Sequence, residues 1–339
     1  MIPATGLPFR RLLVRSLRSV EPDLHVVLDP IRLSLSVPQA MEMLLMRRPA
    51  AIFTTGGYVA LPVLLAASAM RIPVVMWDGN VVPGRSVRVT AHLAGCLAVA
   101  FESTCRALGR RGRPCYLTGT PIRDPGAVGR AEARKALRIP TKEKLILVFG
   151  GSQAVRRFNS AVAEALPRLV ARVRVIHVTG DAGYDEAIAC RDALPEEMRE
   201  RYRPERFLDE EMTLALAAAD LVVGRAGSST LAEVAAFGLP MVVVPYPHAA
   251  GHQRRNAEQM VGAGAARLVE DEAFDAEALL AAAAILDDSK AHDAMAAAAR
   301  SLARRGAAAA VAELVYAAAE RRPYPGADEI EAVSRGVAE

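Results

Sequence analysis

The chain has 339 residues, which is too long for one ordinary domain and suits two domains of about 100 to 200 residues each. With 52% hydrophobic and 24% charged residues, it has the composition of a packed globular protein. The net charge of +4 suits anionic ligands or anionic lipid, but it is too small to indicate a nucleic-acid-binding protein.

The cysteines and the hydropathy pattern narrow the class of protein further. Cys96, Cys105, Cys115 and Cys190 show no CxxC spacing, so we expect buried free thiols in a reducing cytosol, and neither a disulfide framework nor a metal site. No segment reaches the roughly 18 uninterrupted apolar residues that a membrane span requires. Residues 1–20 carry four arginines and no acidic residue, but they lack the apolar segment of a signal peptide.

The first half of the chain is predicted to alternate helices and strands. A helix at 36–46 precedes an apolar strand at 51–54, and a Gly-Gly pair connects that strand to a helix at 59–70. Because helices separate successive strands, this half is expected to form a parallel sheet. The remaining expected elements are a strand at 73–77, a helix at 86–94, a strand at 97–100, a helix at 103–108 and a strand at 115–118.

A domain boundary is expected near 119–121, where Gly-Thr-Pro breaks the pattern and a charged, linker-like segment follows at 123–134. The second half restarts with a strand at 145–149, which leads through a glycine loop into a helix at 155–170. Further strands and helices follow to about Glu320, and we interpret the rest as a disordered polar tail. We therefore predict domains at 1–122 and 123–306, with a C-terminal helix and polar tail at 307–339.

A βαβ unit at 221–244 carries the main signal for ligand binding. Its first strand leads through the small residues of 224–229 into a helix at 230–237, and a second strand follows at 241–244. Small residues let a diphosphate approach the helix N-terminus, where the first N–H groups have no internal partner and the helix dipole is positive. Glu233, which we place on the first turn, can accept two hydrogen bonds from a ribose diol.

Such a loop is by itself a weak signal, because α/β proteins generally have small residues at their strand-to-helix turns. The next segment strengthens it, since residues 245–252 are rich in Pro, His and Gly, and Gln253 and Asn256 lie on the following helix. These polar groups follow parallel strands, where open α/β sheets bind their ligands. The sequence contains no metal-binding motif, no G-x-S-x-G elbow and no Walker-type phosphate loop, so we expect neither a metal nor a cofactor.

Short motifs along the chain resemble the MurG family, which belongs to glycosyltransferase family 28. In the family's order they are GGYVALP from Gly56, GNVVPG from Gly79, GTPIRD from Gly119, FGGSQ from Phe149, FLDEEM from Phe207, RAGSSTLAE from Arg225 and PHAAGHQRRNA from Pro247. The resemblance implies a GT-B fold, in which two doubly wound domains face each other across a cleft, and a metal-independent, inverting transfer. It further implies UDP-N-acetylglucosamine as donor, undecaprenyl-linked lipid I as acceptor, lipid II of peptidoglycan as product, and peripheral attachment to the cytoplasmic face of the cell membrane.

The resemblance also implies which residues contact the substrates. The backbone of Leu208 matches the uracil contact, Glu233 matches the ribose contact, and Ser152 matches a diphosphate contact. Arg123 matches a basic residue beside the donor, and Asn80 matches an asparagine of the acceptor domain. The remaining matched positions, for the diphosphate and the sugar hydroxyls, are Ser228, Ser229, Thr230, Leu231, Ala232, His252, Gln253 and Asn256.

The family pattern is not met everywhere. Where the family usually has His-Glu-Gln-Asn, this chain has Trp-Asp-Gly-Asn, which leaves Asp78 as the acidic candidate for the general base. Thr120 replaces a usual asparagine. The family's N-terminal strand and Gly-Gly-Thr-Gly-Gly-His loop have no counterpart, so a βα unit of roughly 30 or more residues is missing relative to the family. We interpret this as a start further upstream or as a truncation that impairs the acceptor site.

Alternatives stay open for the residues and for the function. Ser152 and Thr230 suit helix caps, Asn80 suits a turn, and Arg123 suits a solvated surface. The functional alternatives are another UDP-sugar enzyme of the GT-B fold, such as a glycolipid synthase or an epimerase, and a non-catalytic UDP-sugar-binding remnant.

The expected helix at 36–46 and its flanks carry a second pattern, in which apolar residues are bordered by arginines. We interpret it as an interfacial patch that is drawn to anionic lipid, with a core-facing helix as the alternative. The residues are Leu35, Val37, Met41, Leu44 and Leu45, with Arg32, Arg47 and Arg48 beside them and Arg10, Arg11, Arg15 and Arg18 upstream.

Overall fold

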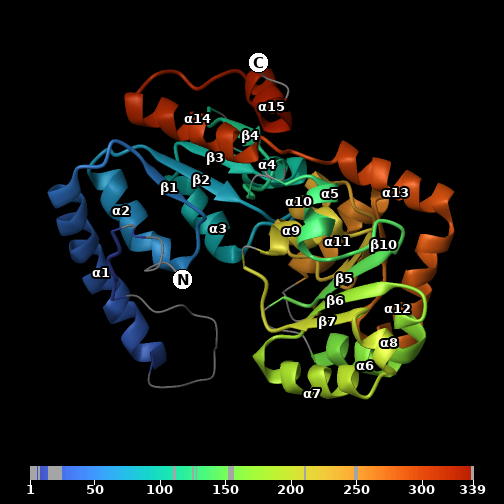
Figure 1. The fold of residues 1–339 in the computed structure, drawn as a ribbon. Coiled ribbons are helices and arrows are strands. Elements are labelled where there is room, and N and C mark those ends of the chain that lie inside the picture. Colours follow the sequence, from blue (N-terminus) through green and yellow to red (C-terminus); the bar gives the residue numbers. More distant parts are fainter. Residues whose placement is uncertain are drawn as a thin grey trace. The chain divides into compact units, whose positions relative to one another are not determined.

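The computed structural model describes Gly6 and residues 8–13, 25–109, 112–123, 126, 128–151, 156–209, 211–247 and 251–336, with the backbone alone for 25–31. The chain divides into two compact units (Figure 1). The first unit comprises Met1–Gly119 and Ala309–Glu339, and the second comprises Thr120–Ala308. Each unit contains a parallel sheet, as the alternation of strands and helices predicts.

The first unit is built on a four-stranded sheet whose strand order follows the chain: β1 (Ile52–Thr54), β2 (Val74–Asp78), β3 (Cys96–Val99) and β4 (Cys115–Leu117). On one face, Ala40 of α1 (His25–Arg47) and Leu64 of α2 (Leu61–Ala69) join Met76 and Leu97 in a buried cluster. The helix expected at 36–46 thus belongs to a longer one. Shorter helical elements are η2 (Tyr58–Ala60), α3 (Arg85–Thr90), η3 (Ala91–Leu93) and α4 (Glu102–Leu108).

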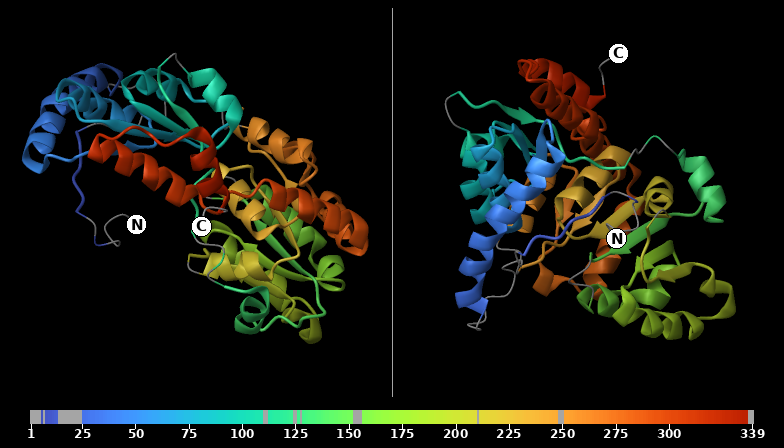
Figure 2. Two further views of the ribbon diagram at one scale, coloured as in Figure 1. Left: turned by 90° about the horizontal axis from the view of Figure 1, so that it is seen from above. Right: turned by 90° about the vertical axis from the view of Figure 1, so that its left-hand side faces the viewer.

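The end of the chain covers the other face of this sheet. Helices α14 (Ala307–Glu320) and α15 (Ala327–Arg335), at the red end of the colour scale, lie against it in Figure 1 and Figure 2. Leu314 and Ile330 are fully buried there, and the Tyr116 hydroxyl donates a hydrogen bond to the Pro325 carbonyl at 2.9 Å. The prediction of a disordered tail is therefore wrong, because Ile330 and Val333 give the polar segment one apolar face that packs on the sheet.

The second unit has a six-stranded parallel sheet in the order β10 (Ala266–Leu268), β9 (Met241–Val243), β8 (Leu221–Gly224), β5 (Leu145–Phe149), β6 (Arg174–Val178) and β7 (Tyr202–Glu205). From β5 the chain first adds strands on one side and then, at β8, continues on the other side of β5. Such a reversal between neighbouring strands is the topological switch point, where open α/β sheets bind ligands.

Helices cover both faces of this second sheet, and its strands are buried. One face carries α6 (Arg156–Val170), α7 (Asp181–Asp192) and α12 (Ala276–Ala283), and the other carries α5 (Arg130–Ala136), α9 (Glu211–Ala218), α10 (Ser228–Phe237) and α11 (His252–Gly262). The sheet therefore separates two apolar clusters, which is typical of a doubly wound domain. The remaining elements are α8 (Glu196–Arg199), η4 (Asp271–Ala273), η5 (Ala284–Asp287) and α13 (Ser289–Ser301).

The segment at 123–134, expected to be a linker, contains a structural anchor. Arg134 of α5 is 3% exposed, and its guanidinium pairs with the Asp220 carboxylate at 2.7 Å. Asp220 also accepts a hydrogen bond from the Leu145 backbone at 2.8 Å, which holds the start of β5. The charged composition indicated solvent exposure, which holds for Arg130 and Glu132, but Arg134 is buried against the Asp220 carboxylate.

Two of the four cysteines form a disulfide bond, Cys105 of α4 with Cys115 of β4. The expectation of four free thiols is therefore wrong, although Cys96 and Cys190 are free. The short connection from α4 to β4 brings the two Cα atoms to 5.8 Å, within the range that a disulfide requires. A spacing of ten residues carries no recognisable signature, so the sequence could not reveal the pair.

Helix α1 divides its apolar residues between the core and the surface. Leu44 is buried, whereas Leu35, Leu45 and Met46 are more than half exposed. The core-facing alternative is therefore confirmed for one side of the helix, whereas the lipid-binding interpretation of the exposed side stays a prediction. Within the described parts of the chain, no helix combines the length and the apolar character that crossing a bilayer demands.

Candidate functional site

Two strand-to-helix loops begin side by side at the switch point of the second sheet. Strand β5 ends at Phe149 directly beside Gly224, the last residue of β8. A Cβ atom at Gly224 would lie 3.1 Å from the Phe149 carbonyl oxygen, so the close approach of these strand ends favours glycine. The loops that begin at Gly150 and Arg225 consequently start from adjacent positions on the carboxyl edge of the sheet.

The loop after β8 ends at an exposed helix N-terminus. Gly227 is the N-cap of α10 and has no side chain to satisfy the first N–H groups, and the Gly227 carbonyl accepts its helical hydrogen bond from Leu231. Ser228, Ser229 and Thr230 therefore supply the N–H groups that precede the first helical hydrogen bond. Thr230 lies inside the helix, so the alternative of a capping role is wrong for this residue. Ser152 of the other loop lies outside the described residues.

Glu233 lies on the second turn of α10, since the helix begins at Ser228 and not at Thr230 as predicted. Its side chain is half-buried, and this burial raises the pKa of the Glu233 carboxyl, while the nearby Arg123 guanidinium acts in the opposite direction. Arg123 donates a hydrogen bond to the Asp209 carbonyl at 2.6 Å, next to Leu208. The structure thus brings Arg123, the connector at 206–209 and Glu233 together at one side of α10.

The polar residues of α11 support the neighbouring loops. Asn256 is 1% exposed, and its amide donates to the Ala226 carbonyl in the loop after β8 at 3.3 Å. The Gln253 side-chain oxygen accepts a hydrogen bond from the Tyr246 backbone at 2.9 Å. His252 is the first residue of the helix, and Leu231 and Ala232 lie in α10. Asn256 and Gln253 therefore tie α11 to Ala226 in the loop after β8 and to Tyr246 after β9.

Arg225 and Asp271 are functional candidates that the sequence analysis missed. Arg225 is 5% exposed and pairs with Asp271 at 2.5 Å, although the two residues are 46 positions apart in the chain. Arg225 could have been noticed as the first residue of the RAGSSTLAE motif. Nothing in the sequence near Asp271 marks it, because η4 has no recognisable pattern.

The candidates in the first unit are built around a turn. Asp78 ends β2 and is 4% exposed, and its carboxylate accepts hydrogen bonds from the backbone and side-chain nitrogens of Asn80 at 3.1 and 3.4 Å. The Thr104 hydroxyl donates to the Asn80 carbonyl at 2.7 Å. This geometry agrees with the turn role that was the alternative for Asn80, and it places Asp78 at the carboxyl edge of the first sheet.

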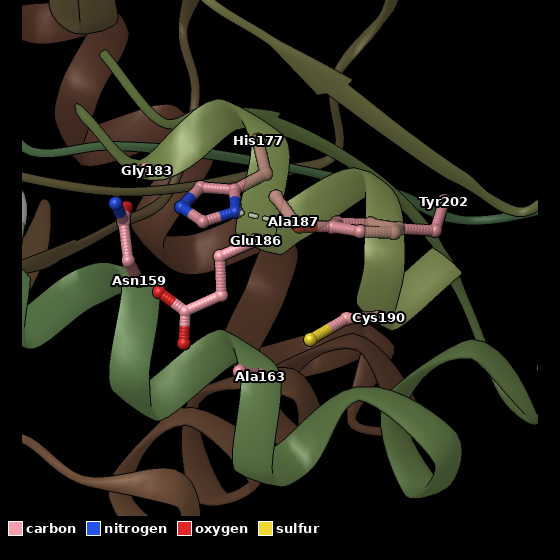
Figure 3. A pocket seen from close by; sticks show the side chains of 8 residues that line it. All are labelled: Asn159, Ala163, His177, Gly183, Glu186, Ala187, Cys190 and Tyr202. Atoms are coloured by element: carbon pink, nitrogen blue, oxygen red, sulfur yellow. Dashed lines mark hydrogen bonds between the residues drawn. The ribbon is translucent and has the colours of Figure 1, made fainter. Parts of the chain in front are cut away.

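A small polar cavity lies between β6, α6 and α7 (Figure 3). The His177 ring is fully buried and turns Nδ1 to the Tyr202 hydroxyl at 2.9 Å and its other side towards Asn159 (Figure 3). The volume of about 10 Å³ corresponds to one water molecule, so this cavity is far too small for a sugar nucleotide. In the described parts of the chain, no group of three or more His, Cys, Asp or Glu side chains has the geometry to hold a metal ion.

His177 should make stability depend on pH. Burial lowers the pKa of His177 to about 3, whereas an unfolded histidine titrates near 6.5. Since the unfolded chain binds the proton first, the contribution of neutral His177 is complete above about pH 6.5 and is lost as the pH falls towards 3. At pH 5 the free energy of unfolding should be about 2 kcal/mol lower than at pH 7 from this group alone.

The measurement is urea unfolding at pH 5 and pH 7 for the wild type and for His177→Gln. Between pH 7 and pH 5, the free energy of unfolding should fall by about 2 kcal/mol less in His177→Gln than in the wild type. His92→Gln is the matched control, because His92 is exposed. If the free energy of unfolding depends equally on pH in the wild type and in His177→Gln, His177 is not the group responsible.

Comparison with known proteins identifies the family. Residues 145–314 match the glycosyltransferase family 28 C-terminal domain, and residues 1–99 match the N-terminal domain of the same family. This chain belongs to glycosyltransferase family 28. The C-terminal domain of the family contains both loops of the switch point and every candidate residue described for the second unit except Arg123.

Relatives and solved structures agree with membership of family 28. A Cutibacterium acnes protein named UDP-N-acetylglucosamine--N-acetylmuramyl-(pentapeptide) pyrophosphoryl-undecaprenol N-acetylglucosamine transferase is 37% identical over 325 residues, which cover 94% of this chain and 83% of that protein. MurG of Acinetobacter baumannii superimposes with a TM-score of 0.69 at 25% identity, over 93% of this chain and 86% of that one. The UDP-GlcNAc 2-epimerase of Neisseria meningitidis shares the fold, with a TM-score of 0.59 at 13% identity over 83% and 79% of the two chains. Together with the two parallel sheets, these neighbours show the GT-B class of fold.

Proposed function

We propose that this family 28 member transfers N-acetylglucosamine from UDP-N-acetylglucosamine to undecaprenyl-diphospho-N-acetylmuramoyl-pentapeptide, and so converts lipid I into lipid II for peptidoglycan synthesis. Relatives that carry the name of this transferase support the proposal at 37% and 38% identity over most of the chain. The observation that carries it is the pair of small-residue loops on the adjacent ends of β5 and β8. Such a pair suits the diphosphate of a nucleotide sugar.

In the proposed donor site, the domain at 123–306 holds the nucleotide sugar. The Glu233 carboxylate accepts hydrogen bonds from the ribose hydroxyls, the backbone of Leu208 meets the uracil, and Arg123 lies beside both. Ser152 and the residues Ser228, Ser229, Thr230, Leu231 and Ala232 surround the diphosphate, and His252, Gln253 and Asn256 serve the sugar.

The proposed chemistry is a single inverting displacement. The acceptor hydroxyl loses its proton as it attacks the anomeric carbon, and the bond from that carbon to the diphosphate breaks. Unpaired N–H groups and the helix dipole at the start of α10 stabilise the charge on the departing UDP. Asp78, at the carboxyl edge of the first sheet, is the proposed general base of the acceptor domain at 1–122.

We further propose that the first unit attaches the protein to the cytoplasmic face of the cell membrane. The exposed side of α1 carries Leu35, Leu45 and Met46 beside the exposed Arg47 and Arg48. An apolar side flanked by cations can insert into the interface and attract anionic headgroups. Phe9 and Leu13, which are about half exposed, add to this surface.

The decisive experiment is a transfer assay with radiolabelled UDP-N-acetylglucosamine and a lipid I analogue. We expect a lipid-linked disaccharide product, with UDP released only when the acceptor is present. Conversion of the donor to its 2-epimer without an acceptor would favour an epimerase. Donor binding without either reaction would favour a non-catalytic sugar-nucleotide-binding protein, and no donor binding would refute the proposed function altogether.

A further inference from the structure

We propose that Asp271 is a positioning residue of the donor site, which ties the loop between β8 and α10 to the described start of α6. Asp271 lies on η4, after the last strand of the second sheet, and belongs to none of the motifs that point to the donor. The inference rests on the proposed function, because it concerns the same sugar-nucleotide site.

The first step of the argument concerns Arg225, which opens the loop between β8 and α10. Its guanidinium is buried and donates hydrogen bonds to the Asp271 carboxylate at 2.5 Å and to the carbonyls of Val244 and Pro245 at 3.2 and 3.4 Å. The same guanidinium lies over the Phe158 ring at 4.8 Å. One side chain therefore connects the loop after β8 to the segment after β9 and to α6.

The second step concerns the other oxygen of the same carboxylate. Asp271 Oδ2 lies 3.3 Å from Nε of Arg157, near the start of the described part of α6, and an Arg157 terminal nitrogen donates to the Glu272 carbonyl at 3.4 Å. Helix α6 follows the loop after β5, just as α10 follows the loop after β8. A single carboxylate thus binds one cation from each of the two loop-and-helix units that meet at the switch point.

The network also reaches the third loop of the site. The Arg225 guanidinium lies 5.4 Å from the centre of the Tyr246 ring, and the Tyr246 backbone is held by Gln253 of α11. The loop after β8, the segment 244–246 after β9 and the described start of α6 are therefore connected by contacts that converge on Arg225 and Asp271. The Asp271 side chain is 14% exposed and acts on the donor site through Arg225 and Arg157. Its role is therefore positioning and not catalysis.

The geometry makes a specific prediction for diphosphate recognition. Without the Asp271 charge, the buried Arg225 guanidinium loses its ion pair with this carboxylate, and the loop after β8 loses its link to Arg157 of α6. A displacement of about 1 Å in groups that bind a reacting ligand can cost about a hundredfold in rate, so kcat/KM for the donor should fall strongly. Glu233 lies on the second turn of α10 and Leu208 in the connector at 206–209, and among the described residues neither contacts the Arg225–Asp271 pair, so the proposed nucleoside contacts should be affected less.

The test uses the full chain with Asp271→Asn, which keeps the side-chain volume and a hydrogen-bond acceptor, and with Asp271→Glu as the conservative variant. Calorimetry measures the Kd of UDP and of UMP, and the transfer assay measures KM and kcat. We expect Asp271→Asn to weaken UDP at least tenfold and UMP less than threefold, and Asp271→Glu to recover most of the UDP affinity. Circular dichroism at the assay temperature confirms that each variant is folded.

Asp275→Ala is the matched control. Asp275 caps α12 by accepting a hydrogen bond from the Ala278 backbone, so its loss should lower the melting temperature without changing the ratio of UDP to UMP affinity. If Asp271→Asn lowers the melting temperature but leaves that ratio unchanged, Asp271 is merely structural and the inference is overturned. If the wild type binds no UDP, the proposed function itself fails, and the two failures are therefore distinguishable.

Discussion

Replacing Glu233 with alanine is expected to raise the Kd of UDP-N-acetylglucosamine about a hundredfold, which calorimetry can measure. Hydrogen bonds to a charged acceptor contribute about 1.5 to 3 kcal/mol each, and a loss of about 3 kcal/mol corresponds to roughly this factor. Glu233 is half-buried on α10, so water cannot fully replace the lost carboxylate. Glu233→Gln should cost about tenfold, because its amide oxygen still accepts hydrogen bonds.

Two controls separate ribose recognition from a general effect on the fold. Glu258→Ala on α11 removes a partly exposed carboxylate that pairs with Arg254 and Arg255, and it should leave donor affinity unchanged. The wild type should bind a 2′-deoxy donor more weakly than the natural donor. Its affinity for the 2′-deoxy donor should not fall below the affinity of Glu233→Ala for the natural donor. Unchanged affinity in Glu233→Ala would remove this residue from the site.

The pH dependence of donor binding follows from the same carboxylate. Burial raises the pKa of Glu233 above that of an exposed glutamate, despite the opposing effect of Arg123. Protonation removes an acceptor, so donor affinity should fall as the pH is lowered through this raised pKa. The fall should be absent in Glu233→Gln.

Replacing Asp220 with alanine is expected to lower the free energy of unfolding of the second unit by about 3 to 5 kcal/mol. The Asp220 carboxylate binds the buried Arg134 at 2.7 Å, Arg130 at 2.8 Å and the Leu145 backbone at 2.8 Å. Its removal leaves the Arg134 guanidinium buried without its carboxylate partner and releases the first residue of β5. In a unit of this size, such a loss corresponds to a fall in melting temperature of about 10 °C.

Calorimetric unfolding tests this prediction, with Asp192→Ala as the control. Asp192 forms an exposed ion pair with Arg191, and such pairs contribute about 0 to 1 kcal/mol. Equal melting temperatures for Asp220→Ala and Asp192→Ala would show that the buried cluster around Asp220 does not stabilise the unit.

Several features of the site could be predicted because they depend only on short, continuous segments of the sequence. The apolar run of β8, the small residues at 226–229 and the helical spacing of Leu231, Val234 and Ala235 lie within one continuous segment. Hydrophobic periodicity and glycine placement act over a few residues, so this strand, loop and helix can be recognised without any knowledge of their neighbours.

Other features could not be predicted, because they depend on residues that are distant in the chain. The sequence alone indicated neither that Asn256 would turn inward to the Ala226 carbonyl nor that Asp271 would meet both Arg157 and Arg225. The buried position of Arg134 and the packing of α15 are of the same kind. In both cases the local composition pointed to solvent or disorder, and a distant partner determined the outcome.

The sequence by itself determined the class of fold, since alternating strands and helices require parallel sheets, and it determined that a small-residue loop would precede α10. Only the tertiary structure decided that β5 and β8 are neighbours and that their loops therefore form one site. The physical reason is that helix and strand periodicity is local, whereas strand order is selected by the long-range burial of both sheet faces.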